Sequence, residues 1–234
     1  MPVHISRTLG RLLASAIAVV LVASPAWAET LETSHQPPFS GTEAYGSCDD
    51  PTCRSSASAD GMGALGAETE LLSAVMGRTE AGIAYGGFVH TLQAPADELR
   101  YQLRVHVDEA FAFVFGGLQV RADALVGLDA IHTAHPAASS FDRLSVASAS
   151  APLGDVRVED QDLVLSSTVK LSGGQKIRAG QILLWPYALA EAAAAAHAPR
   201  ASGYSACADD CLAVGKAHAG IALTVESLTV TEIR

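Results

Sequence analysis

The sequence has few aromatic residues, few charged residues and no cluster of basic side chains. Phe, Trp and Tyr make up 6% of the 234 residues, and Asp, Glu, Lys and Arg together make up 17%. The 15 basic and 25 acidic residues give a formal net charge of −10. A negative protein without a basic patch repels phosphate backbones and anionic lipids, so neither nucleic acid nor an anionic membrane is an expected partner.

Only the N-terminus contains a long apolar run without charge. It covers residues 12–23 and is followed by Ala26-Trp27-Ala28, which has small residues at the two positions that signal peptidase recognises. Three basic residues precede it: His4, Arg7 and Arg11. This layout predicts a signal peptide over residues 1–28, cleaved before Glu29, and a secreted or periplasmic product with no stable membrane span. An uncleaved anchor is the alternative, but the run is shorter than the roughly 20 residues that span a bilayer.

The chain has only four cysteines, in two close pairs near opposite ends: Cys48, Cys53, Cys207 and Cys211. An even number of cysteines in an exported chain favours disulfide bonds. A bridge between positions i and i+4 would distort a helix, which makes pairing between the two couples attractive, and the connectivity stays open. The alternative is a metal site with four thiolates or with Cys and His ligands, although C-x4-C and C-x3-C differ from the C-x2-C spacing of zinc sites.

Composition divides the mature chain into two segments. Residues 29–66 are rich in Ser, Gly, Pro, Thr and Asp, so we expect an irregular, Cys-containing segment. Residues 67–234 show strand-like alternation and should form one β-rich domain. Helices are predicted at 67–76 and, more clearly, at 188–198, an alanine-rich run bounded by prolines.

Alternation of apolar and polar residues marks the strands of this domain. Residues 101–107 alternate, and 111–115 are apolar on both faces, so the latter should form a fully covered central strand. A glycine pair then favours a hairpin to a strand at 118–124. Further strand-like runs are 144–147, 156–158, 163–171, 177–184 and 221–233. The sequence therefore predicts a mainly β fold, an antiparallel sandwich or barrel-like domain with one or two short helices.

One short motif resembles a nucleotide-binding signature. Leu171-Ser172-Gly173-Gly174-Gln175 is similar to the signature motif of the ATP-binding cassette ATPases. The chain has no G-x-x-x-x-G-K-[ST] phosphate loop, so the motif does not predict nucleotide binding. We interpret Gly173-Gly174 as a hairpin connection between the strands on either side, where glycine supplies positive φ.

Histidines and carboxylates are the remaining candidates for chemistry. Neutral imidazole binds transition metals, which makes His106, His132 and His135 candidate metal ligands, with surface or packing roles as the alternative. Carboxylates occur in adjacent couples such as Asp108-Glu109 and Glu159-Asp160, which are typical of solvated turns. The motifs G-x-S-x-G and H-E-x-x-H do not occur, and we assign no catalytic residue and no cofactor.

These observations favour an exported, non-catalytic β-sandwich protein that acts in binding or in cell-surface structure, with an extracytoplasmic ligand or protein as its partner. The alternative is a periplasmic metal-binding protein or a metal-dependent hydrolase with Cys and His ligands, and the oxidation state of the thiols separates the two. A third hypothesis is a polymer subunit that donates its last strand, 221–233, to a neighbour. A stacking platform for sugars would depend on Trp185 and a few tyrosines.

Overall fold

The computed structural model describes residues 26–32, 39–46, 53–60, 63–71, 79–116, 120–194 and 215–234. The strands are β1 (Ala26–Glu32), β2 (Phe39–Gly46), β3 (Cys53–Ala59), β4 (Ala64–Leu71), β5 (Thr79–Leu92), β6 (Glu98–Gly116), β7 (Val120–His132), β8 (Ser140–Ser150), β9 (Leu153–Lys170), β10 (Gly180–Ala194) and β11 (Gly215–Ile233). Two turns of 3-10 helix are η1 (Pro136–Ala138) and η2 (Ser172–Gly174). Within these ranges, no helix has the length and apolar character to cross a membrane.

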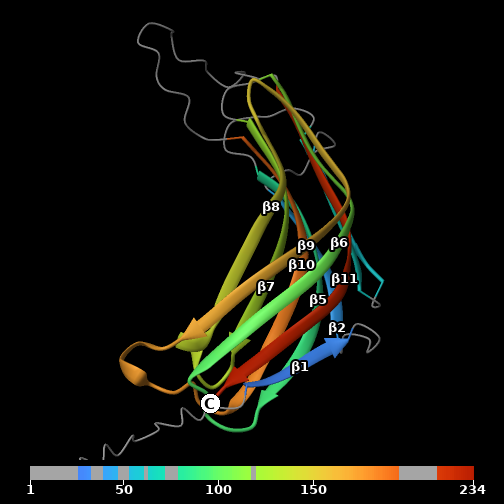
Figure 1. The fold of residues 1–234 in the computed structure, drawn as a ribbon. Coiled ribbons are helices and arrows are strands. Elements are labelled where there is room, and N and C mark those ends of the chain that lie inside the picture. Colours follow the sequence, from blue (N-terminus) through green and yellow to red (C-terminus); the bar gives the residue numbers. More distant parts are fainter. Residues whose placement is uncertain are drawn as a thin grey trace, which may run out of the picture.

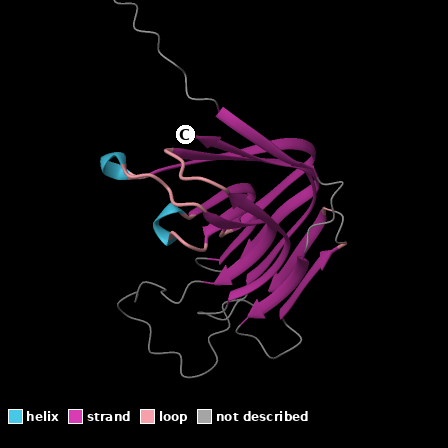
Figure 2. Cartoon of the chain, turned by 90° about the horizontal axis from the view of Figure 1, so that it is seen from below, coloured by secondary structure: helices cyan, strands magenta, loops and turns pink. Residues whose placement is uncertain are grey.

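The strands form two antiparallel sheets that pack face to face (Figure 1). Sheet A has the order β3-β4-β11-β6-β9, with β1 also paired to β11, and sheet B has the order β2-β5-β10-β7-β8. From β4 to β11 the chain changes sheet at every connection except the one between β7 and β8. This is the strand order of a double-sheet jelly roll, and Figure 2 shows its strands from one end. The predicted antiparallel sandwich is confirmed.

The core lies between the sheets and is built by alternating side chains. On β6, Leu99, Tyr101, Leu103, Val105 and Val107 are buried, and the residues between them face outward. A strand with one covered face has this period of two, which is why the strand at 101–107 can be predicted from the sequence.

The alanine-rich run that predicts a helix at 188–198 forms part of β10 instead. Ala188 pairs with Ala84 of β5 and with Val126 of β7, so the strand has neighbours on both sides. The helix preference of alanine over other residues is at most about 0.7 kcal/mol per residue for ordinary side chains, and tertiary packing overrides it here. Residues 195–198 lie outside the described residues.

Strands also occupy much of the segment that composition marks as irregular, residues 29–66. It contains β2, β3 and parts of β1 and β4, whose small and polar residues give little hydrophobic signal. β2 and β3 are edge strands. β2 pairs with β5 in sheet B, and β3 pairs with β4 in sheet A. The helix predicted at 67–76 is wrong for its described part, because residues 67–71 belong to β4.

Two predicted hairpins are wrong because the strands that they would join lie in different sheets. β6 pairs with β9 and β11, whereas β7 pairs with β8 and β10. Likewise, η2 lies between β9 of sheet A and β10 of sheet B. The predicted positive φ is confirmed, at 69° for Gly173 and 70° for Gly174, a conformation that glycine adopts without a Cβ clash.

The last strand, proposed as a donor to a neighbouring subunit, is a central strand of its own sheet. β11 pairs with β6 along one side and with β4 and β1 along the other. Its hydrogen-bonding edges are therefore used within this chain, which does not support the donor hypothesis.

A buried polar pair links the two sheets. His90 Nε2 on β5 lies 3.0 Å from Glu232 Oε1 on β11, and the two side chains are 3% and 8% exposed. The other carboxylate oxygen accepts a hydrogen bond of 2.6 Å from the Arg234 guanidinium. Both oxygens of Glu232 thus have partners, as the burial of a charged group requires.

The Glu232→Ala variant should lower the free energy of unfolding by about 1–3 kcal/mol, because it removes a hydrogen-bond partner from buried His90 and from Arg234. Urea denaturation measures this change. The matched control is Glu159→Ala, since the Glu159 side chain is 64% exposed and its ion pair is a surface one. We expect the control to change stability by less than about 1 kcal/mol. Equal effects in the two variants would contradict the role of the buried pair.

Candidate functional site

A bulge in β6 shapes the outer face of sheet A. In the register against β11, Asp108 is an extra residue between Val107 and Glu109. Asp108 and Glu109 are therefore both exposed, and the buried positions change from odd to even numbers after them. Bulges redirect side chains in this way. As a result, His106 before the bulge and Phe111 after it lie on the same outer face.

A groove of about 350 Å³ crosses this outer face over β3, β4, β11 and β6. Its outward-facing residues are Ser56, Ser58, Gly66, Glu68, Glu109, Phe111, Gly220 and Ala222. The volume lies within the range of small-molecule sites, about 300–1,000 Å³.

The Phe111 ring covers Gly220 on the neighbouring strand. The two residues are paired directly, and a Cβ atom at position 220 would lie 2.5 Å from Phe111 Cε1 and 2.6 Å from Cζ. His218 meets the ring edge-on, with 4.6 Å between centroids, and its Nε2 lies 2.8 Å from Glu68 Oε1. The ring is thus positioned by residues of the groove and its border.

The predicted full coverage of strand 111–115 is wrong. Ala110, Ala112 and Val114 face the core, but Phe111 and Phe113 are only half-buried on the outer face. Phe115, further along the same face, is 57% exposed. Sheet A has no second layer over this face within the described residues, so the apolar residues are surface groups.

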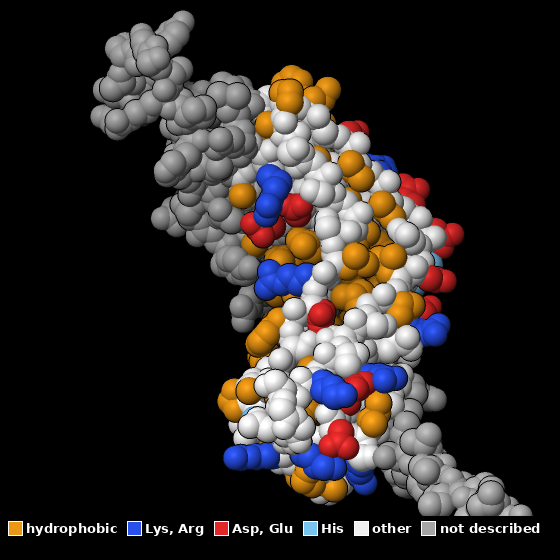
Figure 3. Space-filling view, turned by 60° about the vertical axis from the view of Figure 1, so that its left-hand side comes forward, with side chains coloured by type: hydrophobic (Ala, Val, Ile, Leu, Met, Phe, Trp, Pro, Cys, Tyr) orange, Lys and Arg blue, Asp and Glu red, His pale blue; other side chains and the backbone are white. Residues whose placement is uncertain are grey.

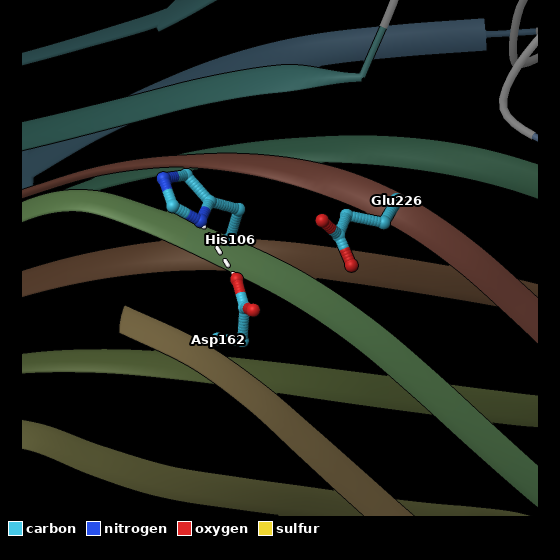
Figure 4. Close-up of side chains that lie close together, drawn as sticks. All are labelled: His106, Asp162 and Glu226. Carbon is cyan, nitrogen blue, oxygen red and sulfur yellow. Dashed lines mark hydrogen bonds and ion pairs between the residues drawn. The ribbon is translucent and has the colours of Figure 1, made fainter. Parts of the chain in front are cut away.

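His106 lies among carboxylates from neighbouring strands. Its Nδ1 is 2.8 Å from Asp162 Oδ1 on β9, and its Nε2 is 3.5 Å from Asp160 and 3.8 Å from Asp108. Glu226, on β11, completes a group in which the donor atoms of His106, Asp162 and Glu226 lie within 4.8 Å of one another (Figure 4). We call these three residues the His106 group.

These carboxylates raise the pKa of His106 above its ordinary value. The hydrogen bond to Asp162 is the largest cause, desolvation opposes it, and the charges of Asp162, Asp108 and Asp160 add to the rise. A raised pKa means that the folded protein binds the proton more tightly than the unfolded chain. This contribution to stability is fully present below about pH 6.5 and is lost as the pH rises through the folded pKa.

The other two predicted metal ligands are not brought to His106. His132 ends β7 of sheet B, is fully buried and donates from Nε2 to the Arg178 carbonyl at 2.8 Å. His135 Nδ1 accepts the Arg178 backbone N–H at 3.3 Å. Both histidines therefore hold the segment after η2. Among the described residues, the one group of three metal-capable side chains contains His106 but neither His132 nor His135.

The sequence interpretation missed Asp162, Glu226 and the groove. Asp108-Glu109 and Glu159-Asp160 are not turns but parts of β6 and β9. The sequence itself shows no change of phase, because large apolar residues occupy the odd positions of both 101–107 and 111–115. The bulge is visible only in the strand register and the burial pattern.

The predicted disulfide cysteines lie largely outside the described residues. This holds for Cys48, Cys207 and Cys211, and only the backbone of Cys53 is described, at the start of β3. The disulfide bonds stay a prediction.

The outer face of sheet B has a second aromatic group. Tyr85 on β5 and Trp185 on β10 stack with 5.6 Å between centroids and 13° between planes. Beside them, Tyr187 and Leu189 are nearly buried, and the Arg143 guanidinium lies 5.9 Å from the Tyr187 ring centroid. Tyr85 and Trp185 cover one ring face of each other, so this group is a packed cluster more than an open platform for a sugar.

Large exposed apolar side chains are concentrated on β8 and β9. Figure 3 shows hydrophobic side chains spread over one face of the molecule, among charged ones. Five of the seven large exposed apolar side chains in the described part lie on these two strands: Phe141, Leu144, Leu153, Val156 and Val164. Val164 of this group lies two residues after Asp162 on the same outward face of β9, so the apolar side chains adjoin the carboxylates around His106.

No family model and no curated protein matches the chain. Among solved structures, a xylan-binding module, CBM15, is similar at a TM-score of 0.27 and 13% identity, over 82% of this chain and 97% of that one. A CBM61 module in complex with β-1,4-galactotriose has a TM-score of 0.28 and 9% identity, over 86% and 94%. The CBM22-1 xylan-binding domain of Paenibacillus barcinonensis Xyn10C has 0.22 and 8%, over 87% and 96%. Similarities this distant support no conclusion about the ligand of this chain.

The imidazole of His106 should titrate above its ordinary midpoint of about pH 6.5, and Asp162→Asn should lower the midpoint because it removes the largest cause of the rise. NMR titration of the histidine side chains measures both values. Asp155→Asn, an exposed carboxylate further along β9, is the control and should leave the midpoint unchanged. A midpoint that does not move in Asp162→Asn would contradict the geometry of this pair.

Proposed function

We propose that the protein is an exported, non-catalytic binding protein and that the groove on the outer face of sheet A holds a neutral carbohydrate. The observation behind this proposal is the make-up of the groove: one aromatic ring and four hydrogen-bonding side chains surround a floor of glycine and alanine. Sugars have apolar C–H faces and many hydroxyl groups, and both kinds of surface find a match in such a site.

The small floor residues support a flat ligand. Gly66 of β4 and Ala222 of β11 are direct partners and project little, whereas Gly220 lies under the Phe111 ring. Glycine within a strand often marks a place where a ligand approaches the backbone closely. Phe111 stands beside this floor, so a sugar ring on the floor would contact the phenyl side chain.

The polar residues of the groove suit hydroxyl groups. Ser56 and Ser58 on β3 both donate and accept hydrogen bonds, whereas Glu68 and Glu109 accept them as carboxylates. A site with two carboxylates disfavours anionic ligands, which is why we propose a neutral sugar.

The two carboxylates are also arranged for binding more than for acid/base catalysis. Glu68 is paired with His218 at 2.8 Å, and Glu109 lies 3.8 Å from the Arg157 guanidinium. Each partner holds its carboxylate in place as a hydrogen-bond acceptor. This supports the non-catalytic part of the proposal.

For export, we propose cleavage before Glu29, as the sequence predicts. Ala26, Trp27 and Ala28 pair with the end of β11, and Glu29–Glu32 continue this pairing as far as Ser227. Cleavage would remove the first three residues of β1 and leave four residues to pair.

Truncation of the aromatic ring should weaken sugar binding. We expect Phe111→Ala to lower affinity about tenfold or more, equivalent to about 1.4 kcal/mol. Affinity electrophoresis against xylan, β-1,4-galactan, mixed-linked β-glucan and other neutral polysaccharides would identify the best probe, and calorimetry with its oligosaccharide would give the affinity. Phe115→Ala is the matched control, because Phe115 lies on the same face of the same strand but outside the groove.

A second variant fills the groove without removing a contact. Ala222→Trp should abolish binding, whereas Ser166→Trp, on the exposed face of β9, should leave it intact. Binding that survives both Phe111→Ala and Ala222→Trp would place the sugar elsewhere, and failure of every neutral polysaccharide to bind the unchanged protein would refute the proposed ligand class.

Protein exported by a bacterial host should have an intact mass that begins at Glu29 and lies four hydrogens below that of the reduced chain. Mass spectrometry before and after reduction and alkylation reads both values. A mass that retains residues 1–28 would contradict the signal peptide, and four alkylated thiols without reduction would contradict the disulfides.

A further inference from the structure

We propose that the His106 group, formed by His106, Asp162 and Glu226, binds a divalent transition-metal ion of the zinc type. This site is separate from the sugar groove, and the inference does not depend on the proposed function. It rests on the convergence of one imidazole and two carboxylates from three neighbouring strands of sheet A (Figure 4).

The strand register brings the three side chains together. Asp162 of β9 is the direct partner of His106 on one side, and Thr224 of β11 is its partner on the other. A second bulge, between Val225 and Ser227, places Glu226 as an extra residue beside this row. The group therefore belongs to a rigid sheet, and neither of its carboxylates comes from a loop.

The donor distances are close to those of a metal site. Zinc binds nitrogen and oxygen ligands at about 2.0–2.2 Å, so two donors on one ion lie at most about 4.4 Å apart. In the His106 group, one donor atom from each of the three residues lies within 4.8 Å of the other two. A contraction of a few tenths of an ångström is enough, and the exposed carboxylates can supply it by side-chain rotation. The Asp162 side chain, for example, is 77% exposed.

Two further carboxylates increase the attraction for a cation. Asp108 and Asp160 lie 3.8 Å and 3.5 Å from His106 Nε2. A carboxylate next to the second nitrogen of a metal-bound imidazole orients the ring and increases its basicity. On β6, Arg104 lies two residues before His106 on the same face. Its guanidinium adds one positive charge beside the four carboxylates.

The imidazole determines the class of metal. Calcium and magnesium prefer oxygen ligands, whereas imidazole suits zinc, copper and nickel. An exposed carboxylate cluster alone would attract any cation weakly. A nitrogen donor among the carboxylates favours the transition metals, with water filling the positions that the protein leaves open.

Calorimetric titration of the chelator-treated, exported protein with zinc chloride tests the proposal. We expect saturable binding, and we expect His106→Ala and Glu226→Gln each to weaken it about tenfold or more. His218→Ala is the matched control, because His218 lies on the same face and is paired with Glu68. This variant should bind zinc as the unchanged protein does. The imidazole NMR signals of His106 should shift on addition of zinc, which reports the site independently of overall affinity.

Several results would overturn the proposal. Zinc affinity that is unchanged in His106→Ala would place the metal at other residues. Absence of saturable zinc binding would show that the His106 group is not a zinc site. Calcium binding that depends on Asp162 and Glu226 but not on His106 would refute the transition-metal assignment. Thermal denaturation in the absence of metal checks that each variant is folded, and unchanged sugar binding in His106→Ala would confirm that the two sites are independent.

Discussion

The extra residue at Asp108 determines which side chains of β6 face the core and which face outward. Without it, alternation would carry the phenylalanines of the following half-strand into the core and the small residues outward. With it, Ala110, Ala112 and Val114 pack inside, and Phe111 comes to lie over Gly220. His106 and the groove then share one face. The position of Phe111 in the groove therefore depends on this change of register, whereas Glu226 of the His106 group depends on the second bulge, in β11.

Strand periodicity made most of the domain readable from the sequence. The half-buried strand at 101–107, the strands at 156–158 and 163–171 and the final strand at 221–233 lie in β6, β9 and β11, where alternating residues face the core. Alanine misled the interpretation at 188–194, because its helix preference is weak compared with pairing to β5 and β7 on both sides. The edge strands β2 and β3 gave no signal, since their pairing is supplied by neighbours far along the chain.

The candidate site was less accessible from sequence than the fold. His106 was identified by its residue type, but its partners Asp162 and Glu226 lie 56 and 120 positions away and meet it only through the register of sheet A. His132 and His135 have the closer sequence spacing, yet both bind the Arg178 backbone. Local spacing identifies ligands on helices and tight loops. In a jelly roll, neighbours in the sheet are distant in the chain, and only the strand order reveals them.

The central claim is that the outer face of sheet A is the binding face of this protein. Chemical-shift mapping of the 15N-labelled protein with the tightest-binding neutral oligosaccharide tests it most directly. The account predicts that the changes concentrate on backbone amides of β3, β4, β6 and β11 around the groove, near Ser56, Glu68, Phe111 and Gly220. Changes centred on Tyr85 and Trp185 of sheet B, with the groove unaffected, would contradict it.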